Sequence, residues 1–423
     1  MNPMSSFFQD GIITNIHALH DLHGPQDYLN LMESKLREYA QSCGISLILP
    51  CLFAEIKKDE ALDRIVAEIQ KVNYLNKVVV ALGDVAGEKQ FMEAREFFAR
   101  FHSRNREVKV VWVDGPRIQN IFSQIQSRGL YPGLRGKGQS VWIALGYLLG
   151  GKESDVIVLH DSDILTYDRI LIARLIEPVA NPDKGFEFCK GYYARVSPTD
   201  RAMKGRVTRL FVLPFVDTMK DIMYSNGNKE LGRFFSFHRS FYYPLAGEFS
   251  ISSKLGSTLN IAYDWGLEVS MLSEVYNRAI PRKIAQVELL TNYEHKHQDL
   301  SPEDKGKGLH RMVVDIAKFY LFYLRSHGLA LDDTYVDMIR HTYYQNSLRF
   351  IKWYSDDSES NGLVYDRYQE ELTARCFRDF LLEAWEEGKK QNDSPLIPSW
   401  NRVHFSVPGI YKNLVKAVED DNS

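Results

Sequence analysis

Apolar runs alternate with amphipathic stretches along the first 160 residues of the chain. Four short segments are almost entirely apolar, as buried strands are: 45–50, 78–82, 108–113 and 156–159. The segments between them repeat apolar residues at helical spacing: 59–72, 91–101 and 141–149. Strands that alternate with helices predict a parallel sheet covered by helices on both faces, and therefore an α/β fold.

Two flanking parts of the chain lack this alternation. The first forty or so residues are mixed and polar, with one helix expected near 28–42. From about residue 308, amphipathic helices are expected without strands between them, over 309–327, 332–352 and 364–388. We therefore expect an N-terminal arm with one helix over 1–42, an α/β domain over 43–307 and a helical C-terminal region over 308–423.

Polar or glycine-containing features fall at the carboxyl ends of the predicted strands. They are Pro50-Cys51-Leu52, Gly83-Asp84, the GKG loop around Lys137, and Asp161 with Asp163. In open α/β sheets, ligands bind in the crevice outside the carboxyl ends of the strands. These four features therefore predict one binding crevice.

Asp161 and Asp163 are separated by one residue and follow an apolar run. Two such carboxylates repel each other unless a cation lies beside them. Mg²⁺ prefers carboxylate oxygens and keeps positions open for substrate phosphates, which makes a metal site one interpretation. Another is that the pair caps the next helix. A third is the nucleophile motif of haloacid-dehalogenase-like phosphatases, but that motif has Thr or Val where this chain has Leu165.

Lys137 stands between two glycines that allow the backbone to approach an anion closely, so a diphosphate contact is expected. The alternative is an ordinary solvated lysine, and the Walker A pattern is not satisfied. Further on, "KGRVTRLFVLP" (204–214) carries Lys204, Arg206, Thr208 and Arg209, which suit a phosphate or carboxylate. The other interpretation of that segment is a basic helix start on the surface.

Two downstream segments add candidate ligands. Asp264 and Glu268 are four residues apart and would share one face if that segment were helical. His295 and His297 follow in a polar segment and could join a metal site as neutral imidazoles.

Composition and charge narrow the class of protein. The chain has 423 residues and a net charge of −3, which gives no electrostatic reason to expect nucleic acid or an anionic membrane surface. Its four cysteines are scattered without a CxxC pair, which fits a reducing compartment. We see neither a secretory signal nor an apolar stretch long enough to span a bilayer. The expectation is a soluble cytoplasmic protein.

The order of these motifs resembles a known family. The succession of an LP strand end with a nearby Glu, GKG, DxD, GRVT, PLAGE, a GxE helix and an E-H pair is similar to the retaining glucosyl-3-phosphoglycerate synthases. It also resembles their relatives, the mannosylglycerate synthases. These are nucleotide-sugar glycosyltransferases of the GT-A fold (Rossmann-like), and the resemblance covers roughly residues 45 to 300.

The resemblance implies a donor site and a metal site. Pro50, Leu52, Glu55, Gly83 and Asp84 would line the nucleotide pocket, with Lys137 and Ser162 also on the donor side. Asp163, together with Asp161 and with His295 as second protein ligand, would hold Mg²⁺ or Mn²⁺. Ala246 and Gly247 would let the sugar approach.

The resemblance also implies an acceptor site and catalytic groups. Gly205, Arg206, Val207 and Thr208 of GRVT would clamp the acceptor's phosphate. The carbonyl of Leu245 would face the anomeric carbon. Glu248 and Glu268 would bind sugar or acceptor hydroxyls, and Asp264 is shared with the mannosylglycerate synthase pattern. The chain departs from the family in two places: His297 stands where an Asn is usual, and Ala246 stands where a Gly is usual.

Three functions are therefore open from the sequence. The favoured one is transfer of glucose from UDP- or GDP-glucose to 3-phosphoglycerate, with attack on the same face as the departing diphosphate. The second keeps the fold but uses glycerate as acceptor or mannose as sugar. The third is a sugar-nucleotide-binding protein without turnover. A homodimer is expected. Aromatic residues in the C-terminal helices, such as Phe319, Tyr320 and Tyr343, indicate helix packing, either within the chain or across such a dimer.

Overall fold

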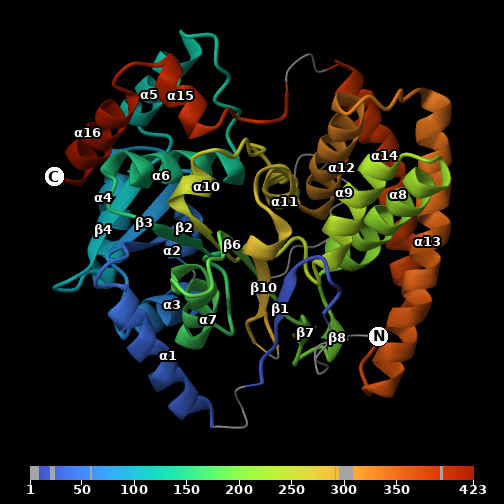
Figure 1. Ribbon diagram of the computed structural model, residues 1–423, viewed down its shortest axis with the longest axis horizontal. Helices are drawn as coiled ribbons and strands as arrows, with labels where there is room; N and C mark the ends of the chain where they lie inside the picture. Colours follow the sequence, from blue (N-terminus) through green and yellow to red (C-terminus); the bar gives the residue numbers. More distant parts are fainter. Residues whose placement is uncertain (1–8, 20–23, 58–59, 291, 295–307, 391–393) are drawn as a thin grey trace.

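An eight-stranded sheet forms the centre of the computed structural model, which describes residues 9–19, 24–57, 60–290, 292–294, 308–390 and 394–423 (Figure 1). Its strand order is β1-β10-β6-β9-β5-β2-β3-β4. The strands are β1 (Thr14–Ile16), β2 (Ile45–Leu52), β3 (Lys77–Gly83), β4 (Glu107–Trp112), β5 (Val156–Leu159), β6 (Phe188–Tyr192), β9 (Phe249–Ser252) and β10 (Ile284–Glu288). β9 runs antiparallel to β5 and β6, and the remaining pairs are parallel.

Helices cover both faces of the sheet, as the alternating pattern predicted (Figure 1). One face carries α5 (Pro116–Gln126), α6 (Lys137–Gly151), α15 (Trp400–Ser406) and α16 (Ile410–Asn422). The other face carries α1 (Pro25–Tyr39), α3 (Glu60–Gln70), α4 (Glu88–Phe98) and α7 (Arg169–Ala180). Successive strand residues point to opposite faces, so Ile48 of β2 joins the first core while Leu47 and Leu49 join the second.

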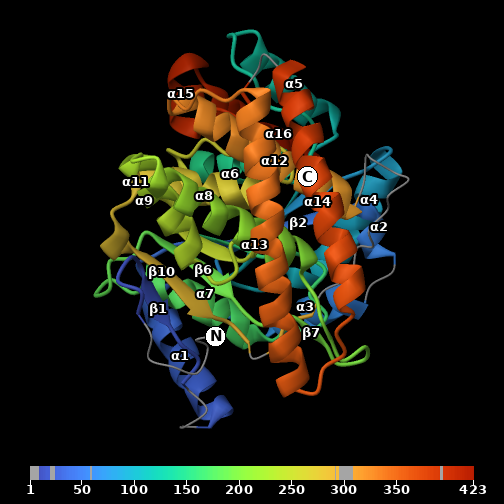
Figure 2. The ribbon, with the colours of Figure 1, turned by 90° about the vertical axis from the view of Figure 1, so that its right-hand side faces the viewer.

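A third core lies beside the sheet and is entirely helical (Figure 2). It joins α8 (Leu213–Ser225) and α9 (Lys229–Ser240) to three long helices, α12 (Gly308–Ser326), α13 (Asp333–Ser360) and α14 (Arg367–Lys390). The remaining short elements are α2 (Phe53–Ile56), α10 (Ser253–Gly256), α11 (Leu267–Arg278), η3 (Ala99–Phe101), the π-helix η4 (Val207–Val212), η5 (Pro281–Lys283) and the ribbon β7 (Val196–Ser197) with β8 (Ala202–Met203).

The expected divisions near residues 42 and 308 do not coincide with the packing. β1, from the expected arm, is a strand of the sheet and pairs with β10. At the other end, Trp400 stacks on Trp142 of α6 with ring centroids 4.4 Å apart, and each indole donates to a carbonyl of the other segment. The last thirty residues therefore belong to the core on one face of the sheet, because their apolar side chains cover α6. Local periodicity does not show which core a helix joins.

Several expected elements are present with nearly the expected bounds, and others were missed. The strand at Val156–Leu159 and the helices after residue 308 are found as expected. β6 and β9 were missed because each is short and carries polar residues, such as Lys190, inside the sheet. No helix in the described part of the chain is long and apolar enough to cross a membrane.

Candidate active site

A pocket of about 570 Å³ opens at the carboxyl ends of β2, β3 and β5. Parallel pairing of β2 with β3 and β5 brings their ends to one edge, so polar residues far apart in sequence meet there. Its lining includes most residues that the sequence singled out: Pro50, Leu52, Glu55, Gly83, Lys137, Asp161, Ser162, Asp163, Gly205, Arg206, Val207, Thr208, Leu245 and Glu268. The single crevice expected at the strand ends is therefore present.

Glu55 links the end of β2 to the acidic segment after β5. Its carboxylate accepts a hydrogen bond from the Ser162 hydroxyl at 2.6 Å and one from the Leu52 backbone N–H at 3.2 Å. Burial and the neighbouring Asp163 carboxylate raise the pKa of Glu55. Glu55, which the resemblance placed in the nucleotide pocket, is thus part of the pocket wall.

Lys137 is the first residue of α6 and lies between two carboxylates. Its ammonium is 2.7 Å from an Asp161 oxygen and 2.9 Å from a Glu268 oxygen. Burial by itself lowers the pKa of Lys137, but the two carboxylates outweigh that effect and raise it above its usual value. The side chain is therefore a fixed cation at the strand ends.

Gly247 packs directly against Asp161. A Cβ atom at this position would stand 2.5 Å from the Asp161 Oδ2 atom, so only glycine leaves room for the carboxylate. The preceding residue, Ala246, accepts a hydrogen bond through its carbonyl from the ammonium of Lys190 at 2.5 Å. Lys190 is 1% exposed, and burial lowers its pKa to about 8. Lys190 was not expected from the sequence. The feature that could have indicated it is a charged residue within an apolar segment.

Five expected site residues lie outside the pocket lining: Asp84, Ala246, Gly247, Glu248 and Asp264. Glu248 is fully buried, and its carboxylate accepts hydrogen bonds from the hydroxyls of Tyr193 (2.8 Å) and Tyr293. Both of these partners are protein hydroxyls, so in this structure the Glu248 carboxylate is engaged inside the protein and does not open into the pocket. Asp84 forms an ion pair with Arg135 at 2.9 Å, at the rim.

Asp264 does not share a helix face with Glu268, contrary to the expectation from their spacing. Helix α11 begins at Leu267, so Asp264 precedes it, and its carboxylate accepts from the Gly266 N–H at 2.9 Å. Burial and the Asp315 carboxylate of α12 raise the pKa of Asp264 to about 6. Of the two carboxylates, only Glu268 is paired with Lys137.

The GRVT segment forms the opposite end of the pocket. Gly205 adopts a φ of 74°, and a Cβ there would lie 2.6 Å from the Tyr243 hydroxyl. That hydroxyl accepts a hydrogen bond from Arg195 at 3.2 Å, and the Arg195 Nε atom is buried without a hydrogen-bond partner among the described residues. Arg195 and Tyr243 line the pocket but were missed, because nothing local distinguishes them from surface residues.

The carboxylates of Asp161 and Asp163 open into the same pocket and are oxygen donors of the kind that Mg²⁺ and Mn²⁺ prefer. No group of three His, Cys, Asp or Glu residues that could hold a metal is found among the described residues. His295 and His297 lie outside them. The donor set present fits a divalent cation that also uses substrate phosphates as ligands.

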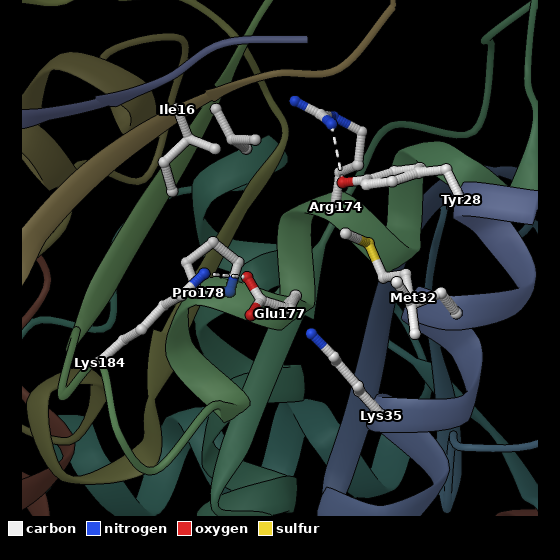
Figure 3. A pocket seen from close by; sticks show the side chains of 10 residues that line it. Ile16, Tyr28, Met32, Lys35, Arg174, Glu177, Pro178 and Lys184 are labelled. Atoms are coloured by element: carbon white, nitrogen blue, oxygen red, sulfur yellow. Dashed lines mark hydrogen bonds and ion pairs between the residues drawn. The ribbon is translucent and has the colours of Figure 1, made fainter. Parts of the chain in front are cut away.

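A second, smaller cavity of about 220 Å³ lies between α1 and α7 (Figure 3). Ile16, Met32 and Pro178 form its apolar wall, while Lys184 is paired with Glu177 at 2.6 Å. Arg174 donates to the Tyr28 hydroxyl at 3.0 Å. Its polar groups are largely engaged with one another, and it borders β1 and β10 instead of the ends of β2, β3 and β5, so the larger pocket is the candidate active site.

A mostly parallel sheet with a carboxylate pair after a central strand and a pocket beside it is the arrangement expected of the GT-A class of nucleotide-sugar glycosyltransferases. No protein-family model matches the chain. The mannosyl-3-phosphoglycerate synthase of Rubrobacter xylanophilus has the same fold, with a TM-score of 0.50 and 21% identity over 71% of this chain and 80% of that one.

Sequence comparison is more specific. The chain is 38% identical over 421 residues to the glucosyl-3-phosphoglycerate synthase of Persephonella marina, covering 99% of this chain and 100% of the relative. It is 36% identical over 378 residues to that of Methanococcoides burtonii, covering 88% and 89%. The chain belongs to the glucosyl-3-phosphoglycerate synthase family, which confirms the resemblance and the GT-A fold expected from the motifs.

Proposed function

We propose that the protein is a metal-dependent retaining glycosyltransferase that moves glucose from UDP- or GDP-glucose to 3-phospho-D-glycerate, giving glucosyl-3-phosphoglycerate. The relatives of Persephonella marina and Methanococcoides burtonii carry the name of that activity. The observation that carries the proposal is that the donor groups Lys137, Asp161 and Asp163 and the acceptor groups Arg206 and Thr208 line one pocket. Two substrates bound there would lie within reach of each other.

The donor end suits a nucleoside diphosphate. Asp163 and Asp161, joined by His295 as expected from the sequence, would hold Mg²⁺ or Mn²⁺, which neutralises negative charge on the departing diphosphate. Lys137 adds a fixed ammonium beside the same carboxylates. The Lys190 ammonium holds the carbonyl of Ala246 in place, and with it the segment whose Leu245 carbonyl would face the sugar.

Attack on the same face as the leaving group agrees with how the carboxylates are engaged. Glu268 is paired with Lys137, and Glu248 is hydrogen-bonded by two tyrosines. Neither carboxylate is proposed as a nucleophile that attacks the sugar from the face opposite the leaving group. We therefore propose that the departing phosphate accepts the proton of the acceptor hydroxyl. A covalent glycosyl-enzyme detected by mass spectrometry during turnover would contradict this mechanism.

The test of the function is a matrix of donors and acceptors. UDP-glucose, GDP-glucose and GDP-mannose would each be combined with 3-phosphoglycerate and with glycerate, in Mg²⁺ and in chelator. Metal-dependent release of nucleotide with a glucose donor and 3-phosphoglycerate is expected, and Asp163→Asn should abolish it. Asp183→Asn, a change on an exposed loop, is the matched control. Release of nucleotide with glycerate but not with 3-phosphoglycerate would make glycerate the acceptor. If no combination released nucleotide, the protein would be a sugar-nucleotide-binding protein without turnover.

We propose further that the protein acts in the cytoplasm as a homodimer. The four cysteines are free thiols, which suits a reducing compartment. Exposed apolar side chains on the outer helices, such as Trp353 and Tyr368, offer a surface for a second copy. Light scattering coupled to size-exclusion chromatography measures the mass in solution, and a monomer at micromolar concentration would contradict the dimer.

A further inference from the structure

A carboxylate from the helical C-terminal region lies behind Arg206, one of the residues that line the pocket. The Arg206 Nε atom is 3.1 Å from the Glu370 Oε1 atom, which belongs to α14. Glu370 is buried, while Arg206 is partly exposed and lines the pocket. In the described part of the chain, no hydrogen bond uses the two terminal nitrogens of Arg206. A guanidinium held in this way at Nε retains its paired end for a bidentate anion.

The second oxygen of Glu370 holds the loop that carries Arg206. It lies 2.7 Å from the Arg209 Nη1 atom, and Arg209 donates in turn to the backbone carbonyls of Lys204 (2.9 Å) and Met203 (3.2 Å). Arg209 also lies over the Tyr354 ring of α13 at 5.0 Å. One carboxylate therefore fixes both the direction of Arg206 and the path of residues 203–209.

The turn before α14 pins the same region from outside. Val364 donates its backbone N–H to the Arg201 carbonyl at 2.7 Å and forms a bridge with Ala202 of β8. Arg201 donates from its side chain to the Gly362 carbonyl at 2.9 Å. On the other side of the pocket, Leu309, Met312 and Ile316 of α12 complete the wall. The helical region thus encloses the acceptor end.

We propose that Glu370 is a positioning residue of the acceptor site: it holds Arg206 by Nε so that both terminal amino groups are presented to the acceptor's phosphate. This inference rests on the proposed function. It gives the helices after residue 308 a role in recognition of the acceptor, because the carboxylate that aims the phosphate-binding arginine comes from α14. Glu370 itself does not touch the substrate, since its two oxygens are engaged by Arg206 and Arg209.

The experiment compares steady-state kinetics of the full chain and of Glu370→Ala, Glu370→Gln and Glu370→Asp, with each substrate varied in turn. Loss of one charge-assisted hydrogen bond that positions Arg206 should raise the KM for 3-phosphoglycerate about tenfold in Glu370→Ala. The KM for the glucose donor should stay within about twofold. Glu370→Gln should show a smaller rise, because its amide oxygen still accepts from one arginine. Glu370→Asp keeps the charge, but it is too short to hold both arginines and should resemble Glu370→Ala.

Glu371→Ala is the matched control, because Glu371 is the next residue of α14 and pairs with Arg367 at 2.8 Å instead of with the loop. Its kinetics should match the wild type. An unchanged acceptor KM in folded Glu370→Gln and Glu370→Asp would overturn the proposal, and so would a lower KM, which would make Glu370 a competitor for Arg206. If Glu370→Ala does not fold, these two variants decide the matter. A wild-type enzyme without product from 3-phosphoglycerate would overturn the proposed function instead.

Discussion

The ammonium of Lys137 lies 2.7 Å from a carboxylate oxygen of Asp161, which joins the first turn of α6 to the end of β5. Part of the positive charge that the acidic pair requires is therefore supplied by the chain itself. Glu268, which is buried, accepts from the same ammonium at 2.9 Å, so three charged groups form one unit at the donor end.

Lys137→Met should lower kcat/KM by about a hundredfold, the usual scale for removing one group that stabilises charge in the transition state. The change leaves Asp161 and Glu268 without their cation. It also removes the ammonium that would offset the negative charge of the departing diphosphate. Steady-state rates with saturating metal measure the effect. Lys89→Met, on the exposed side of α4, is the control and should behave as wild type. Equal rates in both variants would show that Lys137 is only structural.

Gly247→Ala should weaken metal binding roughly tenfold, the scale of a disturbed partner of a metal ligand. The new methyl group would stand 2.5 Å from Asp161, so this carboxylate must move. Titration with Mn²⁺, followed by activity and by the metal's electron paramagnetic resonance signal, gives the affinity. Gly388→Ala is the control: it places its methyl group in open space on α14 and should leave the Mn²⁺ affinity unchanged. Unaltered Mn²⁺ affinity in Gly247→Ala would separate Asp161 from the metal.

Arg195 should bind the carboxylate of the acceptor, since its side chain lines the same pocket as Arg206 and Arg206 is expected to take the phosphate. Arg195→Gln should raise the KM for 3-phosphoglycerate about tenfold, as expected for a lost charged hydrogen bond. Glycerol 3-phosphate, which lacks the carboxylate, should inhibit wild type and variant equally. Arg402→Gln, at an exposed site on α15, serves as control. Weaker inhibition by glycerol 3-phosphate in Arg195→Gln would assign Arg195 to the phosphate.

His238 should make the protein less stable in acid. Burial, with a smaller contribution from Lys190, lowers the pKa of His238 to about 3. The folded protein therefore binds this proton less readily than the unfolded chain, whose His has a pKa near 6.5. The stability that depends on neutral His238 is complete above about pH 6.5 and is lost as the pH falls toward 3, at up to about 1.4 kcal/mol per pH unit.

Urea unfolding of wild type and His238→Gln at pH 7.5 and pH 5 measures this contribution. The variant loses the hydrogen bonds to Tyr320 (3.0 Å) and Ser273 (3.2 Å), so it should be less stable at pH 7.5. The difference from wild type should shrink at pH 5. His102→Gln, at an exposed position, should follow the wild type at both values. If the difference in free energy of unfolding between wild type and His238→Gln were the same at pH 7.5 and pH 5, the protonation of His238 would not contribute to stability in this range.

The donor half of the site was largely predictable from the sequence. Pro50 lies near the end of a strand, Asp161 and Asp163 follow one, and Lys137 begins a helix. The carboxyl ends of parallel strands meet at one edge whatever the details of packing. Order of motifs along the chain then predicted the family. Glu248 and Asp264 were expected at the ligand, yet neither lines the pocket: the first is fully buried, and the second precedes α11. Side-chain direction in those segments depends on neighbours that are distant in sequence.

The sequence by itself determined the elements of the first half of the sheet, the chemistry at its strand ends and the class of reaction, because periodicity and motif spacing are local. Only the tertiary structure decided that Lys190 lies under Ala246, that Arg195 reaches the pocket and that Glu370 holds Arg206 across 164 residues. Such contacts arise from which faces of the helices and strands pack together, and a pattern of apolar residues marks a buried face without naming its partner.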